Sequence, residues 1–346
     1  MIFKRLVPIL LNGSGEAMRA MITGLGHSVP ETRLTNQDLE KLVDTNDKWI
    51  TSRTGIKERR VLGKDKGTSD MAVQAAINAM AQRNISADDI DLIIVATVTP
   101  DMIVPSTAAF VQKKLNARNC WGYDLNAGCS GFVCALATGA QFIESGRHQK
   151  VLVIGADKMT AIMDYQERNT CILFGDGAGA VILEPCPDND NGIIDFSMHL
   201  DGTGEKFLCM PGGGSLHPAT HETVDKRLHY LYQEGKTVFK YAIRGISEDS
   251  AELLEKNRLS SNDVDVFIPH QANIRIMEAV ADKLKLDPDK MVVNIEKYGN
   301  TTAATIPLAM SEAYQQGKMH PGDLILLSAF GAGFAWGSIL FKWAIK

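Results

Sequence analysis

The stretch WGYDLNAGCSGFVCALATGAQFI, residues 121–143, joins a short extended-looking segment, a glycine-rich turn and a long apolar run of helical period. Residues 121–125 predict a strand and residues 132–143 a helix, with Cys129 in the turn between them. The N-terminus of a helix favours an anion, so we expect the pKa of this thiol to be lowered. A fall from about 8.5 to about 7 would raise the thiolate fraction at neutral pH from roughly 3 % to roughly half. A buried structural cysteine is the alternative for this motif alone.

Two polar motifs far downstream supply further reactive side chains. PHQAN at residues 269–273 contains His270, and YGNTT at residues 298–302 contains Asn300. Taken separately, the histidine could be a satisfied core residue and the asparagine a turn residue beside a glycine. Together with a cysteine at a helix start, they predict a thiol nucleophile accompanied by two hydrogen-bonding side chains.

Short apolar runs alternate with helical patterns along the whole chain, which predicts an α/β fold with a repeated organisation. The polar turn cluster at residues 188–192 is the expected join between the two halves. The predicted strands are 90–98, 151–155, 178–183, 264–268 and 324–328, and the predicted helices are 71–83, 132–144, 238–257 and 274–284.

Composition narrows the class of protein. The 346 residues are 45 % hydrophobic and 22 % charged, which is ordinary for a soluble globular protein. A net charge of -5 argues against a nucleic-acid-binding protein, whose footprint would be basic. The six cysteines contain no C-x-x-C pair, so no zinc site or redox motif is predicted. A reducing compartment, and therefore a cytoplasmic location, is the simplest expectation.

Two segments are apolar enough to suggest a membrane. The first, residues 6–11, is short and broken by Pro8, so we do not interpret it as a signal peptide. The second, residues 324–341, is long enough to span a bilayer, but three glycines interrupt it. Two buried strands joined by a glycine turn explain that segment better.

Three other patterns are weaker. The Gly24–Gly26 turn lacks the third glycine of a dinucleotide fingerprint, and no Lys-Ser/Thr pair follows the glycines at 175–179. Close packing of those glycines against a strand is the preferred interpretation. His217 and His221 stand four apart, but Pro218 lies between them, so loop histidines are expected rather than metal ligands.

With its motifs in view, the chain resembles the β-ketoacyl-acyl carrier protein synthase III family of the thiolase-like superfamily, from about residue 18 to the C-terminus. The resemblance implies a five-layered αβαβα fold and a homodimer. Its duplicated halves would be residues 18–190, which carry the cysteine, and residues 191–346, which carry the histidine and asparagine. Residues 1–17 would be an extension, which we expect to be disordered. The motifs are NAGCSGF, PHQANIRI and YGNTTAATIP, with NDKWITSRTGI, FGDGAGA and FGAGFAWGS at corresponding places.

The resemblance also implies a reaction. An acyl-CoA and malonyl-acyl carrier protein would give 3-oxoacyl-acyl carrier protein, CO2 and CoA, which starts fatty-acid synthesis. Cys129 would hold the acyl group, and His270 and Asn300 would stabilise the enolate oxygen formed by decarboxylation. The backbone N–H groups of Cys129 and Ala332 would form a second oxyanion hole. Neither a metal nor a bound cofactor is expected, since coenzyme A and the phosphopantetheine carrier are substrates.

The substrates would be bound by residues at matching family positions. Trp49 and Arg168 would sandwich the adenine of coenzyme A, and Arg53 would contact a phosphate. A half-buried tryptophan and surface arginines without a ligand are the alternative. Asn169 differs from the glycine that commonly follows that arginine in the family.

Two further expectations concern the carrier protein and the acyl primer. Arg275 and Lys283, with Lys285, lie on one side of a predicted helix and could meet an acidic carrier. Val104 occupies a position where many relatives carry phenylalanine, reaching across the dimer to close the acyl pocket. A smaller side chain predicts acceptance of primers longer or more branched than acetyl.

Rival interpretations remain open. Within the same fold, the chain could be a synthase for a specialised metabolite with an unusual primer. A non-catalytic partner subunit would have no use for Cys129, His270 and Asn300 together. A thiolase or 3-hydroxy-3-methylglutaryl synthase would want an additional catalytic acid or cysteine base, which we cannot place.

Overall fold

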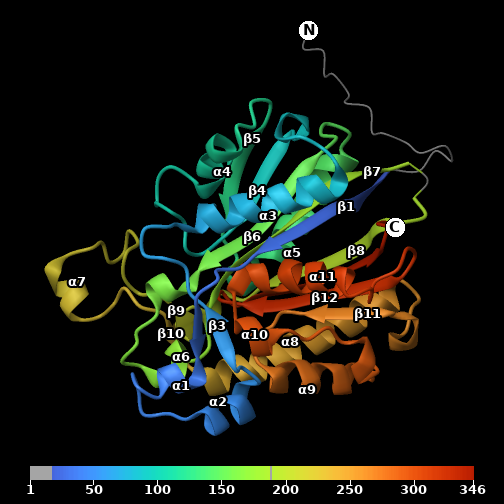
Figure 1. Cartoon of the computed structure of the whole chain (residues 1–346). Helices are drawn as coiled ribbons and strands as arrows, with labels where there is room; N and C mark the ends of the chain where they lie inside the picture. Colours follow the sequence, from blue (N-terminus) through green and yellow to red (C-terminus); the bar gives the residue numbers. More distant parts are fainter. Residues whose placement is uncertain (1–17, 188) are drawn as a thin grey trace.

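The computed structural model describes residues 18–187 and 189–346. The N-terminal extension expected at residues 1–17 lies outside the described residues, as does Asp188. The fold is built on two main sheets of similar topology, which are visible as stacked layers in Figure 1.

The first sheet contains strands from the N-terminal half in the order β1-β7-β6-β4-β5. Its central strands β4 and β6 are parallel, β4 also pairs in parallel with β5, and β7 runs antiparallel to both of its neighbours. The edge strand β5 has no second strand partner among the described residues. The bounds are β1 (Arg19–Ser28), β4 (Leu92–Ala96), β5 (Trp121–Leu125), β6 (Val151–Lys158) and β7 (Asp176–Cys186).

The second sheet repeats this arrangement with strands from the C-terminal half, in the order β8-β13-β12-β11. Strands β11 and β12 are parallel, and the other pairs are antiparallel. An isolated parallel bridge between Phe267 and Met291 stands where β5 stands in the first sheet. The bounds are β8 (Gly192–Leu200), β11 (Val266–Pro269), β12 (Leu324–Gly331) and β13 (Ala335–Lys342).

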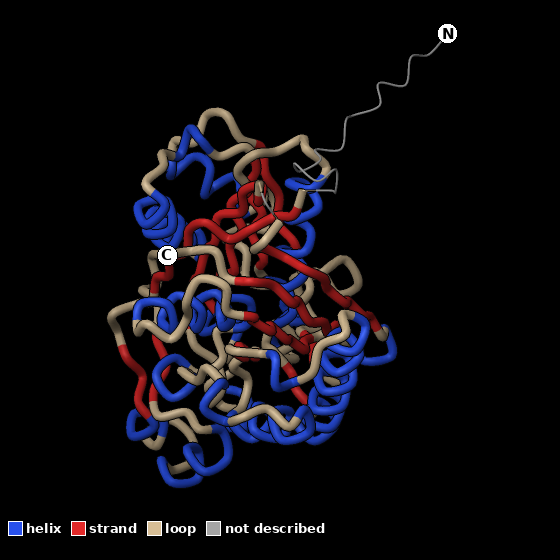
Figure 2. The backbone as a smooth tube through the Cα atoms, turned by 90° about the vertical axis from the view of Figure 1, so that its right-hand side faces the viewer, coloured by secondary structure: helices blue, strands red, loops and turns tan. Residues whose placement is uncertain are grey.

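Six long helices complete a five-layered αβαβα arrangement, as the resemblance implied (Figures 1 and 2). Helices α3 (Thr68–Arg83) and α4 (Thr107–Leu115) cover the outer face of the first sheet. Helices α5 (Gly131–Glu144) and α11 (Thr305–Gln315) lie between the sheets and contact both. Helices α8 (Gly235–Lys256) and α9 (Ile274–Leu284) cover the outer face of the second sheet.

Hydrophobic burial explains these layers. Every residue of β4 is buried because helices cover both faces of the sheet, as its unbroken apolar sequence predicts. The largest core lies between the sheets and includes Phe132 and Val133 from α5 together with Ile306 and Met310 from α11. Separate cores lie beneath α3 and beneath the pair α8 and α9. The predicted strands and helices are therefore confirmed, and residues 324–341 form β12 and most of β13.

Shorter elements surround the layers, and the loop with α7 protrudes from the body at the left of Figure 1. No described helix is both long enough and apolar enough to cross a membrane. The short helices and strands are β2 (Arg33–Thr35), α1 (Asn36–Leu39), α2 (Asp47–Thr54), β3 (Glu58–Arg60), α6 (Arg168–Cys171), β9 (Leu208–Cys209), α7 (His221–Asp225), β10 (Tyr232–Gln233) and α10 (Ile295–Tyr298). The 3-10 helices are η1 (Ala87–Asp89), η2 (Gly128–Ser130), η3 (Met159–Ile162), η4 (Gly202–Gly204), η5 (Ser261–Asp263), η6 (Pro288–Lys290) and η7 (Thr302–Ala304).

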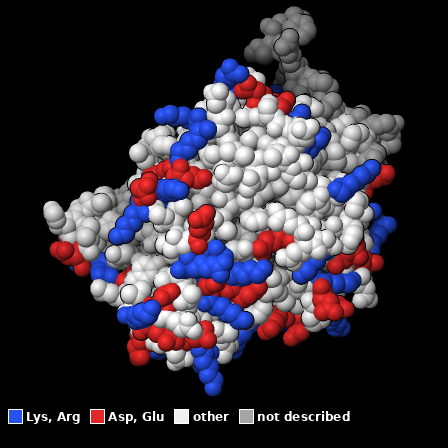
Figure 3. Space-filling view, in the orientation of Figure 1, with Lys and Arg blue, Asp and Glu red and all other residues white. Residues whose placement is uncertain are grey.

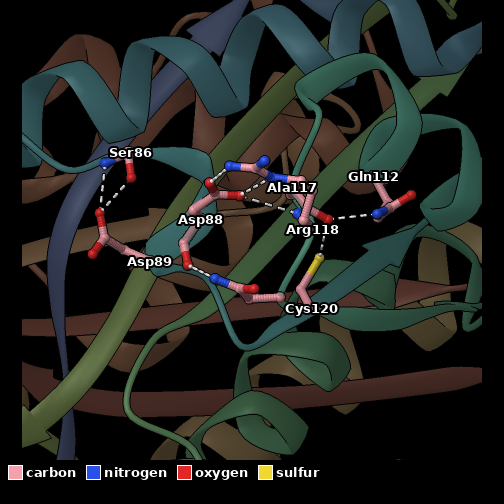
Figure 4. Close-up of polar contacts among 8 residues, drawn as sticks. Ser86, Asp88, Asp89, Gln112, Ala117, Arg118 and Cys120 are labelled. Carbon is pink, nitrogen blue, oxygen red and sulfur yellow. Dashed lines mark hydrogen bonds and ion pairs between the residues drawn. The ribbon is translucent and has the colours of Figure 1, made fainter.

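A polar cluster fixes the turn that leads into the edge strand β5 (Figure 4). Asp88 in η1 accepts hydrogen bonds from the backbone and the guanidinium of Arg118, the latter at 2.5 Å. Gln112 on α4 and Cys120 both donate to the carbonyl oxygen of Ala117. These contacts tie the connection between α4 and β5 to the turn before β4, so the start of β5 is held from two sides.

Candidate active site

A cavity of about 820 Å³ brings together the three side chains singled out from the sequence. Cys129, His270 and Asn300 all line it, although they are far apart in the chain. Each follows a strand or short helix that ends at this point: β5 before Cys129, β11 before His270 and α10 before Asn300. Residues of α6, β10 and α8 form much of the remaining wall.

Cys129 lies in η2, directly before α5, and is buried. Burial raises the pKa of the Cys129 thiol to about 12, and the nearby Asp157 carboxylate adds to the rise. The expected lowering of this pKa is therefore wrong. A helix N-terminus contributes at most about 2 kcal/mol, or about 1.5 pKa units, which is less than the effect of burial here. The Cys129 thiol is therefore protonated at neutral pH.

The Asn300 side chain is oriented by the backbone of Thr302. Its Oδ1 accepts a hydrogen bond of 2.8 Å from the N–H of Thr302, so its NH2 group is left to donate toward the cavity. A hydrogen bond from Asn300 opposes the rise in the pKa of Cys129. Thr302 has a positive φ of 53°, rare for a β-branched residue, and this conformation supports the turn.

The glycines of the FGDGAGA motif allow the Asn300 turn to approach. The N–H of Gly175 donates to the Asn300 carbonyl at 3.1 Å, and the N–H of Asn300 donates to the Leu173 carbonyl at 2.8 Å. A Cβ on Gly175 would lie 2.5 Å from the Tyr298 carbonyl oxygen. Close packing of these glycines is confirmed, but against the Asn300 turn and α11 rather than against a strand: a Cβ on Gly179 would lie 2.7 Å from the Leu308 nitrogen.

His270 follows β11 and is buried, with 4 % of its surface exposed. Burial lowers the pKa of His270 to about 3, so the imidazole is neutral at physiological pH. Its Nδ1 lies 2.7 Å from the hydroxyl oxygen of Thr305. That contact is the ring's single hydrogen bond to any described residue.

Asp157 is a buried carboxylate beside the site that the sequence analysis missed. Its Oδ1 accepts from the backbone N–H groups of Val98 and Thr99 and from the hydroxyls of Thr97 and Thr99. Its Oδ2 accepts from the N–H of Ala303 at 3.1 Å, which ties η7 to the end of β4. Burial raises the pKa of Asp157 to about 6, despite these hydrogen bonds.

The backbone of residues 331–332 lies against the cysteine turn. A Cβ on Gly331 would be 2.5 Å from the Cys129 nitrogen, and a Cβ on Gly128 would be 2.8 Å from the Ala332 nitrogen. Gly128 has a φ of +57°, which a side chain would strain. The two N–H groups expected to form an oxyanion hole thus belong to adjacent backbone segments.

The residues expected to bind coenzyme A lie beside the cavity lining. The Arg168 guanidinium lies over the Trp49 ring, 5.2 Å from its centre, and donates to the Asp44 carbonyl at 2.9 Å. Asn169, the next residue, lines the cavity. Arg53 in α2 accepts, through its carbonyl oxygen, a hydrogen bond from Asn273, which also lines the cavity.

Exposed basic residues lie on α8 and α9, among acidic ones. Arg275 is exposed and lies over the Phe239 ring at 5.7 Å, and Phe239 lines the cavity. Lys283 is exposed in the last turn of α9. Figure 3 shows acidic side chains interspersed with basic ones on the lower part of the molecule, around these elements. The sequence analysis missed three exposed residues of α8, although their four-residue spacing is typical of one helix face: Lys236, Lys240 and Arg244.

Val104 lies outside the cavity lining of its own chain and is 80 % exposed. Its neighbours Met102 and Ile103 are exposed as well, so an apolar segment projects from the loop before α4. An exposed apolar segment of this kind is typical of a contact surface.

Comparison with known proteins agrees with this geometry. Residues 123–202 match the model of 3-oxoacyl-(acyl-carrier-protein) synthase III, and residues 254–343 match the model of its C-terminal region. A curated beta-ketoacyl-(acyl-carrier-protein) synthase III of Koribacter versatilis is 54 % identical, over 94 % of this chain and 98 % of the relative.

Solved structures show the same similarity. A 3-oxoacyl-(acyl-carrier-protein) synthase III from Aquifex aeolicus superposes with a TM-score of 0.87 at 44 % identity, over 94 % of this chain and 100 % of the other. A priming beta-ketosynthase from the R1128 polyketide pathway reaches the same TM-score at 31 % identity, over 94 % and 96 % of the two chains.

Proposed function

The chain belongs to the 3-oxoacyl-(acyl-carrier-protein) synthase III family, and on this premise we propose that it condenses an acyl-CoA with malonyl-acyl carrier protein. The products are 3-oxoacyl-acyl carrier protein, CO2 and CoA, and the reaction starts fatty-acid synthesis. The observation that carries the proposal is the convergence of Cys129, His270 and Asn300 on one cavity.

In the first half-reaction, the Cys129 sulfur attacks the acyl-CoA carbonyl. The thiol proton ends on the departing CoA sulfur, and an acyl thioester forms on Cys129. Because burial keeps this thiol protonated, the proton leaves during the attack rather than before it. The N–H groups of Cys129 and Ala332 are the proposed donors to the tetrahedral oxyanion.

In the second half-reaction, the malonyl thioester loses CO2 and an enolate remains. The NH2 group of Asn300 and the neutral imidazole of His270 donate hydrogen bonds to the enolate oxygen. The enolate carbon then attacks the acyl thioester, and the Cys129 sulfur leaves as a thiolate that takes a proton from solvent. A neutral histidine suits this role because it can donate without adding a buried positive charge.

Separate measurement of the two half-reactions tests these roles. Cys129→Ala should form no acyl-enzyme by intact-protein mass spectrometry but should still release CO2 from malonyl-acyl carrier protein. Asn300→Ala should become acylated, while its CO2 release falls about 100-fold, as expected for a lost oxyanion donor. Cys186→Ala, at a buried cysteine at the end of β7 outside the cavity lining, is the matched control and should behave as wild type. Normal CO2 release by Asn300→Ala would contradict the assignment.

The surfaces around the cavity offer contacts for both substrates. We propose that the adenine of coenzyme A inserts between Trp49 and Arg168, which now contact each other, with Arg53 at a phosphate. Carrier protein, which is acidic, would approach the basic residues of α8 and α9. Arg275 and Lys283 would meet it close to the cavity.

We further propose that the protein is a cytoplasmic homodimer joined through β5. Among the described residues, β5 has a free edge, and Trp121 on it is 50 % exposed. Trp121 contacts Phe142 and His148, and Phe142 also lines an open, mainly apolar groove of about 530 Å³ between α5 and β8. A second copy of the chain would cover the three aromatic rings, the groove and the edge of β5 together.

A synthase for a specialised metabolite is the second candidate, favoured by the match to a priming polyketide ketosynthase. The acyl primer separates the two candidates. If Val104 reaches the partner's acyl pocket, its isopropyl group leaves space that a phenylalanine ring would fill. A panel of acyl-CoAs should then acylate Cys129 with chains longer or more branched than acetyl, and Val104→Phe should shift the preference toward acetyl. Strict acetyl preference in the wild type would remove this candidate.

A further inference from the structure

The hydroxyl of Thr305 is the one hydrogen-bonding partner that the described residues give to the His270 ring, and it lies on the side of Nδ1. Thr305 is the first residue of α11, and its side chain is buried. The position of this hydroxyl bears on which ring nitrogen carries the proton. A neutral imidazole has a single N–H, so a proton on one nitrogen leaves the other as an acceptor.

Two acceptors compete for the Thr305 hydroxyl proton. The His270 Nδ1 lies at 2.7 Å and the Thr302 carbonyl oxygen at 3.0 Å. The Thr302 carbonyl already accepts the backbone N–H of Thr305 at the end of η7. It is therefore satisfied without the hydroxyl, whereas Nδ1 has no other donor among the described residues.

We propose that Thr305 is a positioning residue whose hydroxyl donates to His270 Nδ1 and so keeps the ring proton on Nε2. This inference rests on the proposed function, in which His270 donates a hydrogen bond to the enolate oxygen. With the opposite tautomer, Nε2 would present a lone pair to the enolate and could not stabilise it. The burial that holds His270 neutral makes the choice of tautomer decisive, because a doubly protonated ring is not available.

The surroundings of Thr305 hold its hydroxyl in place. Asp157 on β6 accepts, at Oδ2, the N–H of Ala303, two residues before Thr305, and so fixes η7 against β6. The N–H of Thr302 binds Asn300. One turn thus orients both proposed enolate donors: the backbone N–H of Thr302 orients Asn300, and the hydroxyl of Thr305 orients His270.

Removing only the hydroxyl tests the proposal. Thr305→Val keeps the shape, and Thr305→Ser keeps the hydroxyl. Selective 15N labelling of histidine, assigned by the signal lost in His270→Gln, reports which ring nitrogen is protonated. We expect Nε2 to carry the proton in the wild type and in Thr305→Ser, with protonation shared between the nitrogens in Thr305→Val. CO2 release from malonyl-acyl carrier protein should fall about 10-fold or more in Thr305→Val and recover in Thr305→Ser. Acylation by acyl-CoA should stay within about threefold.

A matched control lies on the same helix. The Ser311 hydroxyl contacts Nδ1 of His27 at 2.8 Å, outside the cavity lining. Ser311→Ala removes a similar buried contact and should leave the ratio of the two half-reactions unchanged. Should Thr305→Val not fold, Thr305→Ala removes the hydroxyl with a smaller side chain and takes its place in both measurements.

Three results would overturn the proposal: a wild-type ring protonated on Nδ1, undiminished CO2 release by Thr305→Val, or no recovery in Thr305→Ser. Failure of the proposed function would look different. The wild type would then release no CO2 from malonyl-acyl carrier protein, while the Nε2 tautomer and its dependence on Thr305 could still be observed.

Discussion

Burial favours the neutral acid form of the Asp157 side chain over the carboxylate. Its folded pKa of about 6 lies above the ordinary value, so the folded state binds this proton more tightly than the unfolded state. The contribution is therefore stabilising below about pH 4 and is lost as the pH rises through about 6. At neutral pH the ionised form is tolerated because five hydrogen bonds reach its two oxygens.

We expect Asp157→Asn to remove this pH dependence. Between pH 7 and pH 5, the wild type should gain about 1 kcal/mol in free energy of unfolding relative to the variant. The variant should also lose CO2 release. Its side-chain NH2 would replace the oxygen that now accepts the N–H of Ala303, so two donors would face each other there. Urea unfolding at both pH values, at equal protein concentration, measures the difference. A difference that does not change with pH would contradict the assignment.

The residues with potentially reactive side chains could be predicted from the sequence. The residues that hold those side chains in position could not. Cys129 and His270 stand in motifs whose residue types already suggest reaction chemistry. Asp157 and Thr305 are common residues in apolar surroundings, and their roles depend on which backbone segment the fold brings against them. The pKa of Cys129 was mispredicted for the same reason, since sequence shows a helix start but not the depth at which the thiol is buried.

At the scale of elements, the exposed basic residues of α8 and α9 give a prediction for the carrier protein. Arg275→Glu replaces an attraction by a repulsion at an exposed site, a change of about 1 kcal/mol, or about fivefold in affinity. The KM for malonyl-acyl carrier protein should rise by about that factor, and its salt dependence should weaken. Acylation by acyl-CoA should be nearly unchanged.

Steady-state kinetics at two salt concentrations check this expectation. Lys318→Glu, an exposed lysine just beyond α11, is the matched charge reversal and should have no effect. Equal losses in both half-reactions of Arg275→Glu would show that the residue supports the fold rather than docking, since its guanidinium also covers Phe239.

Long periodic elements were predictable, and short ones were not. Helix α9 matches its predicted bounds because its apolar residues recur at helical spacing and Asn273 caps its N-terminus. The four-residue helices α6 and α10 have too few residues to show a period. They are held by tertiary contacts, as where the Tyr298 hydroxyl and the Asn294 amide both donate to Glu312 on α11.

At the scale of the molecule, the two sheets have matching strand order, and among the described residues the first sheet carries one more strand, β5, which lies at its edge with no strand beyond it. The apolar alternation of the sequence indicated the repeat but not which edge would remain open. That edge is where the proposed dimer would form, and a second exposed apolar segment, residues 102–104, lies in the loop between β4 and α4.

Trp121→Glu should therefore convert the protein from dimer to monomer. The ring is half exposed and packs on Phe142, so in a dimer it would be buried at the interface, where a charged side chain is unfavourable. Loss of a central aromatic residue costs about 2 kcal/mol or more, which raises the dissociation constant at least about 30-fold. Sedimentation velocity over a range of protein concentrations measures this shift.

Ile77→Glu, at an exposed apolar residue on α3, is the control and should leave the oligomeric state unchanged. If both variants sediment as the wild type does, β5 is not the interface. If Trp121→Glu is monomeric and its acyl-CoA preference also changes, a partner residue such as Val104 contributes to the acyl pocket.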